Sequence, residues 1–98
     1  MGEIRFTWDP AKALENQRKH GIGFDEARTV FSDEGALLIG DPDHSADEDR
    51  FVIIGFSSFA RLLTVCHCYR ESDEVIRIVS ARKATGSESD QYTREYMR

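Results

Sequence analysis

The stretch Val75-Ile76-Arg77-Ile78-Val79-Ser80-Ala81-Arg82-Lys83 begins as a β-branched strand and ends in a basic segment. Successive side chains of a strand point to opposite faces of a sheet. If Ile76 and Ile78 enter the core, Arg77 between them emerges on the other face. A guanidinium on a mostly apolar face is either paired or positioned to meet an anion. The function of the chain therefore depends on whether Arg77 meets a carboxylate, such as Glu48, or a bound phosphate.

Three further strands are predicted before this stretch, and the connections between them are short. Such spacing favours consecutive antiparallel pairing, a meander. The four predicted strands of this set are residues 36–40, 51–56, 61–69 and 75–80.

The first third of the chain predicts a short strand over residues 4–8 and two helices. Asp9 and Pro10 supply an N-cap and a first-turn proline, and Gly21 is a natural left-handed stop after His20. Leu14, with Ala11, Ala13 and the nearby Trp8, is expected to form the narrow buried stripe of the first helix. The second helix places four apolar side chains on one face at helical spacing, and we expect them in the core: Phe24, Ala27, Val30 and Phe31.

A final helix is predicted after Gly86, capped within residues 87–90 and carrying Tyr92, Tyr96 and Met97. The predicted fold is thus α+β, with an N-terminal strand and two helices, an antiparallel β-meander and a C-terminal helix. With 98 residues, 40% of them hydrophobic and 32% charged, the chain fits one domain over residues 1–98. It carries no apolar run near the ~20 residues of a membrane span and no signal-peptide pattern, so a cytoplasmic location is expected.

The net charge of −5 argues against a general nucleic-acid coat protein, but the charge is uneven. Acidic residues gather in one segment and basic residues follow further on: Asp41, Asp43, Asp47, Glu48 and Asp49, then Arg61, Arg70, Arg77, Arg82 and Lys83. A local basic site is therefore compatible with an acidic chain.

Neither a metal site nor a cofactor is predicted. Cys66 and Cys68 are too close in sequence for an easy disulfide and too few for a zinc site, so we expect buried thiols. The acidic segment contains His44 but matches no calcium-loop spacing, which favours a solvated loop over a metal-dependent hydrolase.

His67 lies inside an apolar run and is either a satisfied core residue or a partner of Arg77 on one face of the sheet. A histidine, arginines, a lysine and a carboxylate on one face would suit metal-free RNA cleavage. That reaction needs a base for the ribose 2′-hydroxyl, an acid for the leaving oxygen and cations for the phosphate. The helix dipole alone is sufficient to explain basic residues such as Lys19 and His20 at a helix C-terminus. The spacing of these residues does not carry the assignment unaided.

Over nearly its whole length the chain resembles the BrnT toxin family. The matching segments, in chain order, are Phe6-Thr7-Trp8-Asp9-Pro10-Ala11-Lys12, Asn16, Lys19-His20-Gly21, Phe24-Asp25-Glu26-Ala27, Val30-Phe31, Asp33, Glu48-Asp49-Arg50-Phe51, Ile54-Gly55, Ser57-Ser58, Arg61, Val65-Cys66-His67, Ile76-Arg77-Ile78-Val79-Ser80-Ala81-Arg82-Lys83-Ala84-Thr85, Glu88 and Tyr92.

The resemblance implies a RelE-like fold and a ribonuclease toxin of a type II toxin–antitoxin system. It further implies that a BrnA-like antitoxin neutralises the toxin and that their complex represses the shared operon, with the antitoxin contacting the DNA. The residues that the resemblance places in the site are Lys19, Glu48, Arg61, His67, Arg77 and Arg82 for catalysis, and Lys19, His20, Arg61, Arg77, Arg82 and Lys83 for RNA binding. Either His67 or Glu48 would be the base or the acid.

The chain departs from the family pattern at two places. Family members often carry glycine before the arginine that matches Arg61, where this chain has Ala60. The segment after Thr85 is often strongly basic in the family, whereas residues 86–91 read Gly-Ser-Glu-Ser-Asp-Gln. The second departure removes local attraction for RNA, and it motivates an alternative: a catalytically silent binding module of the same fold that acts mainly through its antitoxin complex.

Overall fold

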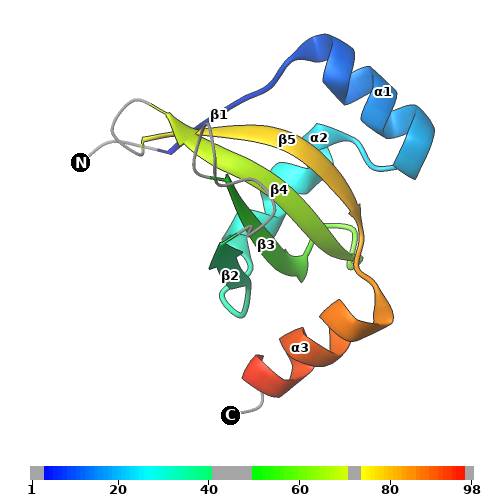
Figure 1. Cartoon of the computed structure of the whole chain (residues 1–98), viewed down its shortest axis with the longest axis vertical. Helices are drawn as coiled ribbons and strands as arrows, with labels where there is room; N and C mark the ends of the chain where they lie inside the picture. Colours follow the sequence, from blue (N-terminus) through cyan, green and yellow to red (C-terminus); the bar gives the residue numbers. More distant parts are fainter. Residues whose placement is uncertain (1–3, 41–49, 71–73, 97–98) are drawn as a thin grey trace.

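The computed structural model describes residues 4–40, 50–70 and 74–96. The elements follow the order strand, helices, strands, helix, which confirms the predicted α+β class (Figure 1). Their bounds are β1 Arg5–Thr7, α1 Pro10–His20, α2 Phe24–Ala27, the 3₁₀ helix η1 Arg28–Ser32, β2 Leu37–Gly40, β3 Arg50–Phe56, β4 Leu62–Arg70, β5 Val75–Lys83 and α3 Gly86–Tyr96.

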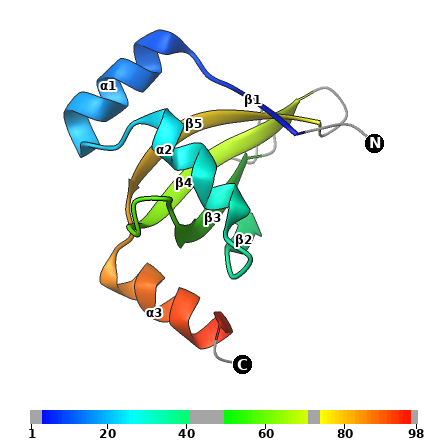
Figure 2. The same ribbon diagram turned by 180° about the vertical axis from the view of Figure 1, so that it is seen from behind.

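The strands form one five-stranded sheet in the order β1-β5-β4-β3-β2. The pairs from β2 to β5 are antiparallel, so the predicted meander is confirmed. The short β1 adds a parallel partner to the outer edge of β5. Helix α2 crosses one face of the sheet, whereas α3 lies at one end of the other face (Figures 1 and 2). We call these the helix-covered face and the open face.

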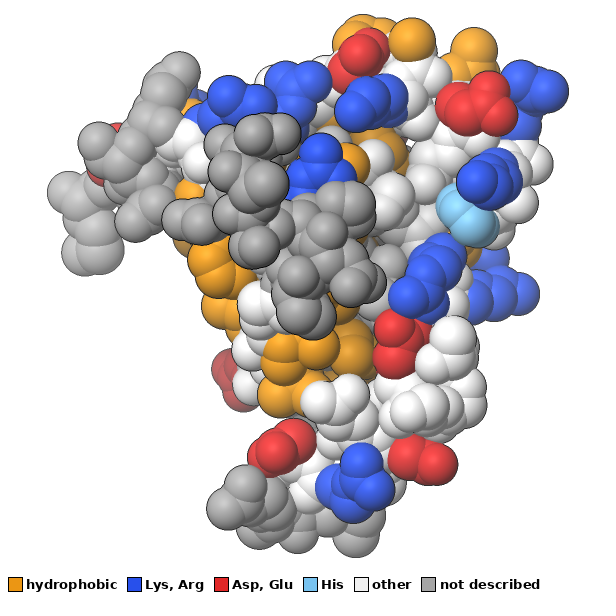
Figure 3. Space-filling view, in the orientation of Figure 1, with side chains coloured by type: hydrophobic (Ala, Val, Ile, Leu, Met, Phe, Trp, Pro, Cys, Tyr) orange, Lys and Arg blue, Asp and Glu red, His pale blue; other side chains and the backbone are white. Residues whose placement is uncertain are grey.

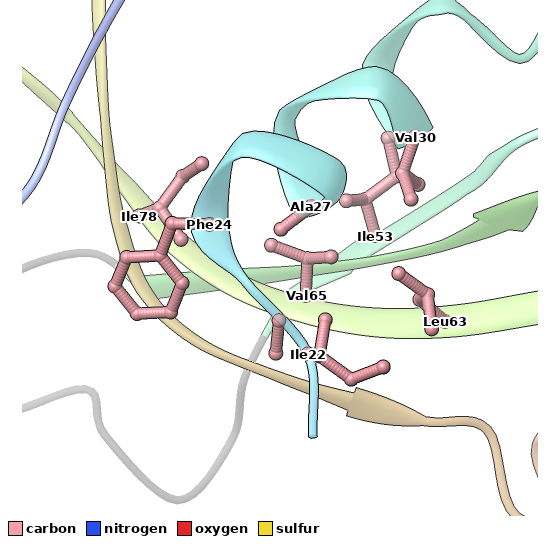
Figure 4. Close-up of a cluster of buried hydrophobic side chains, with 9 residues drawn as sticks. Ile22, Phe24, Ala27, Val30, Ile53, Leu63, Val65 and Ile78 are labelled. Atoms are coloured by element: carbon pink, nitrogen blue, oxygen red, sulfur yellow. The ribbon is translucent and has the colours of Figure 1, made fainter. Parts of the chain in front are cut away.

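The core lies between α2 with η1 and the helix-covered face (Figure 4). The predicted second helix is shorter than expected, because only one turn is α-helical and the chain continues as η1. Its apolar residues nevertheless enter the core as predicted: Phe24, Ala27 and Val30 are buried, and Phe31 is partly buried against them.

Helix α1 begins and ends as its sequence predicts. The Asp9 carboxylate accepts a hydrogen bond from Ala11 N–H at 2.9 Å, and Gly21 adopts a left-handed φ of 71°. The predicted burial of Leu14 is wrong, since this side chain is 67% exposed. The buried residue of α1 is Asn16.

Asn16 fixes α1 against the edge of β5 that β1 is too short to cover. Its side-chain amide donates to the carbonyls of Ala81 (2.8 Å) and Ile22 (2.9 Å), and its carbonyl accepts from Ala81 N–H at 3.1 Å. The amide thus completes the backbone pairing of Ala81 as a neighbouring strand would. A polar residue carries out the docking that apolar packing was expected to provide.

Helix α3 begins with a capping box. The Thr85 hydroxyl accepts from Glu88 N–H at 3.1 Å, and the Glu88 carboxylate accepts from Thr85 N–H at 2.9 Å. The cap therefore lies just before the predicted 87–90 segment. On the buried side of α3, Tyr92 stacks edge-on against Phe56 and donates to the Asp33 carboxylate at 2.8 Å.

Candidate functional site

The open face carries a row of polar side chains along β5. In the β4–β5 register, Arg77 lies opposite Cys68, Ser80 opposite Cys66, and Arg82 opposite Thr64. Directly opposed residues of an antiparallel pair share a face. Along β4 these positions span four residues, which separates Arg77 and Arg82 by about 13 Å.

A β-bulge in β5 brings the two arginines onto one face. Cys66 pairs with Ser80 but His67 pairs with Ile78, so Val79 is an extra residue in β5. Strict alternation would place Arg77 and Arg82, five positions apart, on opposite faces. With the bulge, Ile78 and Ala81 both enter the core, and Arg82 joins Arg77 on the open face.

Arg77 is half-buried at the centre of this arrangement, and the expected burial of Ile76 and Ile78 on the other side is confirmed. Within residues 4–40, 50–70 and 74–96, no carboxylate pairs with the Arg77 guanidinium. Glu48, the acidic partner considered from the sequence, lies outside the described residues.

Arg82 lies on the same face but has a carboxylate partner. Its guanidinium donates two hydrogen bonds to Glu88, at 2.8 and 2.9 Å, and Thr64 donates to the same carboxylate at 2.8 Å. The Arg82 hydrogen bond is the main cause that lowers the pKa of Glu88 to about 2, against the opposing effect of burial. An anion must compete with Glu88 to reach Arg82.

Arg61 is held at the turn between β3 and β4. It forms a two-pronged ion pair with Glu26 of α2, in which Arg61 Nε donates to Glu26 Oε2 at 2.9 Å and Arg61 Nη2 donates to Glu26 Oε1. The Ser57 hydroxyl also donates to Glu26, at 2.7 Å. The Arg61 hydrogen bond is the largest cause that lowers the pKa of Glu26, a side chain only 5% exposed.

Glu26 is therefore a residue whose role the sequence does not reveal. Acidic residues in the first turn of a helix are explained by the helix dipole alone. Only the tertiary contact shows that Glu26 binds the arginine 35 positions later.

His67 lies on the helix-covered face with none of its surface exposed. Its ring contacts Phe31 edge-on at 4.8 Å between centroids, and Phe51 and Tyr69 are also within ring-contact distance. His67 Nδ1 is 3.4 Å from the Val65 carbonyl, and Nε2 has no hydrogen-bond partner among the described residues. Burial lowers the pKa of His67, so the ring is neutral near pH 7. The structure separates His67 from Arg77 by the thickness of the sheet.

The remaining predicted RNA-binding residues lie near the opposite end of β5. Lys19 and His20 end α1, one turn after Asn16, and Lys83 ends β5 opposite Leu63, on the helix-covered side. The contact between Asn16 and Ala81 brings these two ends together. The structure thus divides the predicted set into the open-face arginines, the enclosed His67, the Arg61–Glu26 pair and this second basic end.

Two further properties bear on the class of protein. In the part of the chain that the structure describes, no group of side chains has the composition and proximity to hold a metal ion. Among the same residues, no helix is long and apolar enough to cross a membrane.

Comparison with known proteins agrees with the resemblance seen in the sequence. A family model described as "Ribonuclease toxin, BrnT, of type II toxin-antitoxin system" matches residues 8–88. The crystal structure of the Brucella abortus ribonuclease toxin BrnT is similar with a TM-score of 0.59 and 22% identity, covering 87% of this chain and 99% of that chain. At that identity the structural match shows a shared fold, and no curated protein matches the chain. Because the family model spans most of the sequence, the chain belongs to the BrnT family of ribonuclease toxins of type II toxin–antitoxin systems.

Proposed function

We propose that this toxin is an endoribonuclease that cleaves RNA without a metal ion, acts in the cytoplasm and is neutralised by a BrnA-like antitoxin. The reaction class is attack by a ribose 2′-hydroxyl on the adjacent phosphorus. A base removes the hydroxyl proton, an acid protonates the departing 5′-oxygen, and the products carry a 2′,3′-cyclic phosphate and a 5′-hydroxyl. Cations stabilise the additional negative charge on the phosphate in the transition state.

The position of Arg77 is the observation that carries this proposal. Its planar guanidinium can donate two parallel hydrogen bonds to phosphate oxygens. It stands half-buried on the open face without a carboxylate partner among the described residues. A partly desolvated cation binds an anion more strongly than one fully surrounded by water. Arg77 is therefore assigned to the scissile phosphate, with Arg82 as a second cation further along the row.

The acid–base residues are a separate question. His67 is enclosed by aromatic rings and fully buried, so we assign it to packing and not to proton transfer. Arg61 is assigned to the turn that it holds through Glu26. Glu48, the other acid–base residue predicted from the family, lies outside the described residues and stays a prediction.

The partners follow from the same proposal. The antitoxin would cover the open face and thereby exclude RNA, and contact with operator DNA would come through the antitoxin. The acidic balance of the toxin, a net charge of −5, agrees with leaving DNA binding to the partner.

The proposal is tested with purified, antitoxin-free protein and a labelled single-stranded RNA, in the presence and absence of EDTA. Cleavage that persists in EDTA and leaves 2′,3′-cyclic phosphate ends is the expected result. Expression in growing cells should arrest growth, and co-expression of the neighbouring antitoxin gene should restore it. Cleavage that disappears in EDTA and returns with added Mg²⁺ would refute metal independence.

A catalytically weak binding module is the second candidate. It is favoured by the carboxylate partners of Arg61 and Arg82, because both pairs must open before these arginines can meet RNA. This candidate predicts tight antitoxin binding and operon repression with no RNA cleavage. Cleavage that depends on Arg77 would exclude it.

A further inference from the structure

Four arginines from four strands meet at one corner of the open face. Arg5 of β1 and Arg70 of β4 both lie opposite Val75 of β5, one on each side. One step further along β5, Arg77 lies opposite Cys68, and Cys68 lies opposite Arg50 of β3. The four side chains therefore occupy two adjacent rows across the sheet.

Sheet geometry sets the spacing within this corner. Neighbouring strands are about 4.8 Å apart, and rows two residues apart are separated by about 6.6 Å. Arg5 and Arg70 are thus roughly 10 Å apart across Val75, and each is one strand and one row from Arg77. In Figure 3, Lys and Arg side chains gather over β1 and the adjoining part of β5 on this face.

The corner is hollowed. A depression of about 640 Å³ is lined by Arg5, Phe6, Thr7, Arg70, Val75 and Arg77. The described residues that line it supply three arginines, one threonine hydroxyl and apolar groups, and none of these lining residues is a carboxylate. Val75, at its floor, is only 8% exposed, whereas Arg5, Thr7 and Arg70 are exposed around it.

We propose that this depression is an RNA-backbone subsite, in which Arg5 and Arg70 bind the phosphates that flank the one held by Arg77. This inference rests on the proposed ribonuclease function and extends it from one phosphate to a short segment of the strand. Arginines contribute to affinity by neutralising phosphates and releasing counterions. Thr7 can donate a hydroxyl hydrogen bond to a phosphate or ribose oxygen.

The open shape of the depression favours a single strand over a duplex. A single strand can follow the two rows of arginines, and its bases are free to point away from the sheet. Arg5 and Arg70 act on affinity and not on the reacting bonds, because Arg77 separates them from the rest of the polar row. The subsite should therefore matter for long RNA and not for a very short one.

The test uses the full chain and an uncleavable probe, a single-stranded 2′-O-methyl RNA, in ten- and two-nucleotide lengths. Fluorescence anisotropy is measured over a range of salt concentrations for Arg5→Gln, Arg70→Gln and the double variant. Arg28→Gln is the matched control, since Arg28 is an exposed arginine in η1, on the helix-covered side. Urea midpoints establish that each variant is folded, and Arg5→Ala or Arg70→Ala replaces a glutamine variant that is not. Arg5→Lys and Arg70→Lys are measured beside them as variants that keep the charge.

We expect each glutamine variant to weaken binding of the longer probe roughly tenfold and to reduce the salt slope by about 1. Lysine variants should keep most of the affinity, because they keep the charge. Binding of the two-nucleotide probe, which has a single phosphate, should be unchanged, as should every property of Arg28→Gln.

Folded Arg5 and Arg70 variants with the affinity and salt slope of the wild type would overturn the subsite, whether or not the wild type cleaves RNA. So would variants that lose antitoxin binding but keep RNA binding, since the depression would then be an antitoxin contact. A wild type that binds the probe through Arg5 and Arg70 yet cleaves no RNA would support the subsite and refute the proposed ribonuclease function.

Discussion

An adjacent carboxylate changes what an arginine can do for a phosphate. Arg61 and Arg82 each donate two hydrogen bonds to a glutamate, and the anion that displaces the glutamate must replace those bonds. Arg77 has no such competitor among the described residues. The three arginines look alike in the sequence, but their neighbours give them different environments.

His67 is a second residue whose environment decides its role. Its Nε2 is buried without a hydrogen-bond partner in the described part of the chain, and this costs free energy that burial of an apolar side chain would not cost. We expect His67→Leu to leave RNA cleavage intact and to raise the free energy of unfolding by roughly 1 kcal/mol. Urea denaturation at pH 7 and a cleavage assay measure the two effects.

The same variant should also change the pH dependence of stability. The pKa of His67 is lowered in the folded protein by burial, so below its ordinary value of 6.5 the unfolded chain binds a proton that the folded chain does not. The wild type should lose stability on acidification from pH 7 to 5 more steeply than His67→Leu. A folded His67→Leu protein that does not cleave RNA would contradict the assignment of His67 to packing and indicate a catalytic role.

Ala60 shows how a departure from the family pattern is accommodated. Its φ of 61° is left-handed, a conformation that costs an L-residue about 1–2 kcal/mol and glycine very little. The turn keeps the backbone that a glycine would adopt, held by Ser57 N–H, which donates to the Arg61 carbonyl at 2.8 Å. Arg61 is therefore positioned despite the missing glycine.

We expect Ala60→Gly to raise the free energy of unfolding by up to about 1 kcal/mol, because relief of strain exceeds the entropy cost of glycine. Urea denaturation measures the change, and Ala36→Gly, at a position that has no left-handed φ, should instead destabilise the protein. A loss of stability in Ala60→Gly would mean that the turn carries no such strain.

At the scale of elements, α3 depends on one glutamate with two functions. Glu88 completes the capping box with Thr85 and binds Arg82 of β5, so the helix start and its attachment to the sheet are coupled. Glu88 lies in the acidic segment of residues 86–91, but it is itself one of the residues that match the family. Its structural function is therefore separate from the loss of positive charge in that segment.

The pH dependence of stability tests this coupling. The folded-state pKa of Glu88 is about 2 and its ordinary value is 4.5, so its contribution is complete above pH 4.5 and is lost as the pH falls towards 2. The free energy of unfolding of Glu88→Gln should be about 1 kcal/mol below that of the wild type at pH 7. Near pH 2 the two proteins should be almost equally stable. Urea midpoints of both proteins across this range give the comparison, and parallel curves would show that the carboxylate charge is unimportant.

Helix α1 depends on Asn16 in a comparable way. Asn16→Ala leaves the buried N–H and C=O of Ala81 and the C=O of Ile22 without this partner, and should cost about 2–4 kcal/mol. Asn16→Asp keeps the acceptor for Ala81 N–H but sets a buried carboxylate oxygen against the carbonyls of Ala81 and Ile22, so its stability should fall at least as much. Leu14→Ala, at an exposed position of the same helix, is the control. A cost for Asn16→Ala no greater than that of Leu14→Ala would contradict the docking role.

The strands, the meander and the limits of α1 could be predicted because they follow from local patterns: β-branched runs, short connections, Asp9 with Pro10, and Gly21. The pairing of β1 with β5 and the bulge at Val79 could not, because both depend on register between distant segments. The face on which Arg82 lies depends on that bulge. The sequence pointed to the charged residues as a group, which stays a prediction, and it did not separate Arg77 from the arginines paired with Glu26 and Glu88.

At the scale of the whole molecule, the two faces of the sheet carry different kinds of residues. The helix-covered face carries the core (Figure 4), with His67 buried on the same side, and the open face carries the arginine rows. A chain with a net charge of −5 can hold a basic site because the strands bring its arginines to one corner. The family match concerns the fold as a whole, whereas the proposed RNA cleavage depends on this local arrangement.

The rate of RNA cleavage by Arg77→Ala, in EDTA and with the antitoxin absent, tests the role of this face most directly. Removing a cation that stabilises transition-state charge should lower kcat about 100- to 1,000-fold, while Arg28→Ala keeps the rate of the wild type. The free energy of unfolding of Arg77→Ala, measured with urea, should stay within about 1 kcal/mol of the wild type. The Arg77 guanidinium has no partner among the described residues to lose. A folded Arg77→Ala protein that cleaves RNA at the wild-type rate would contradict the assignment of Arg77 to the scissile phosphate.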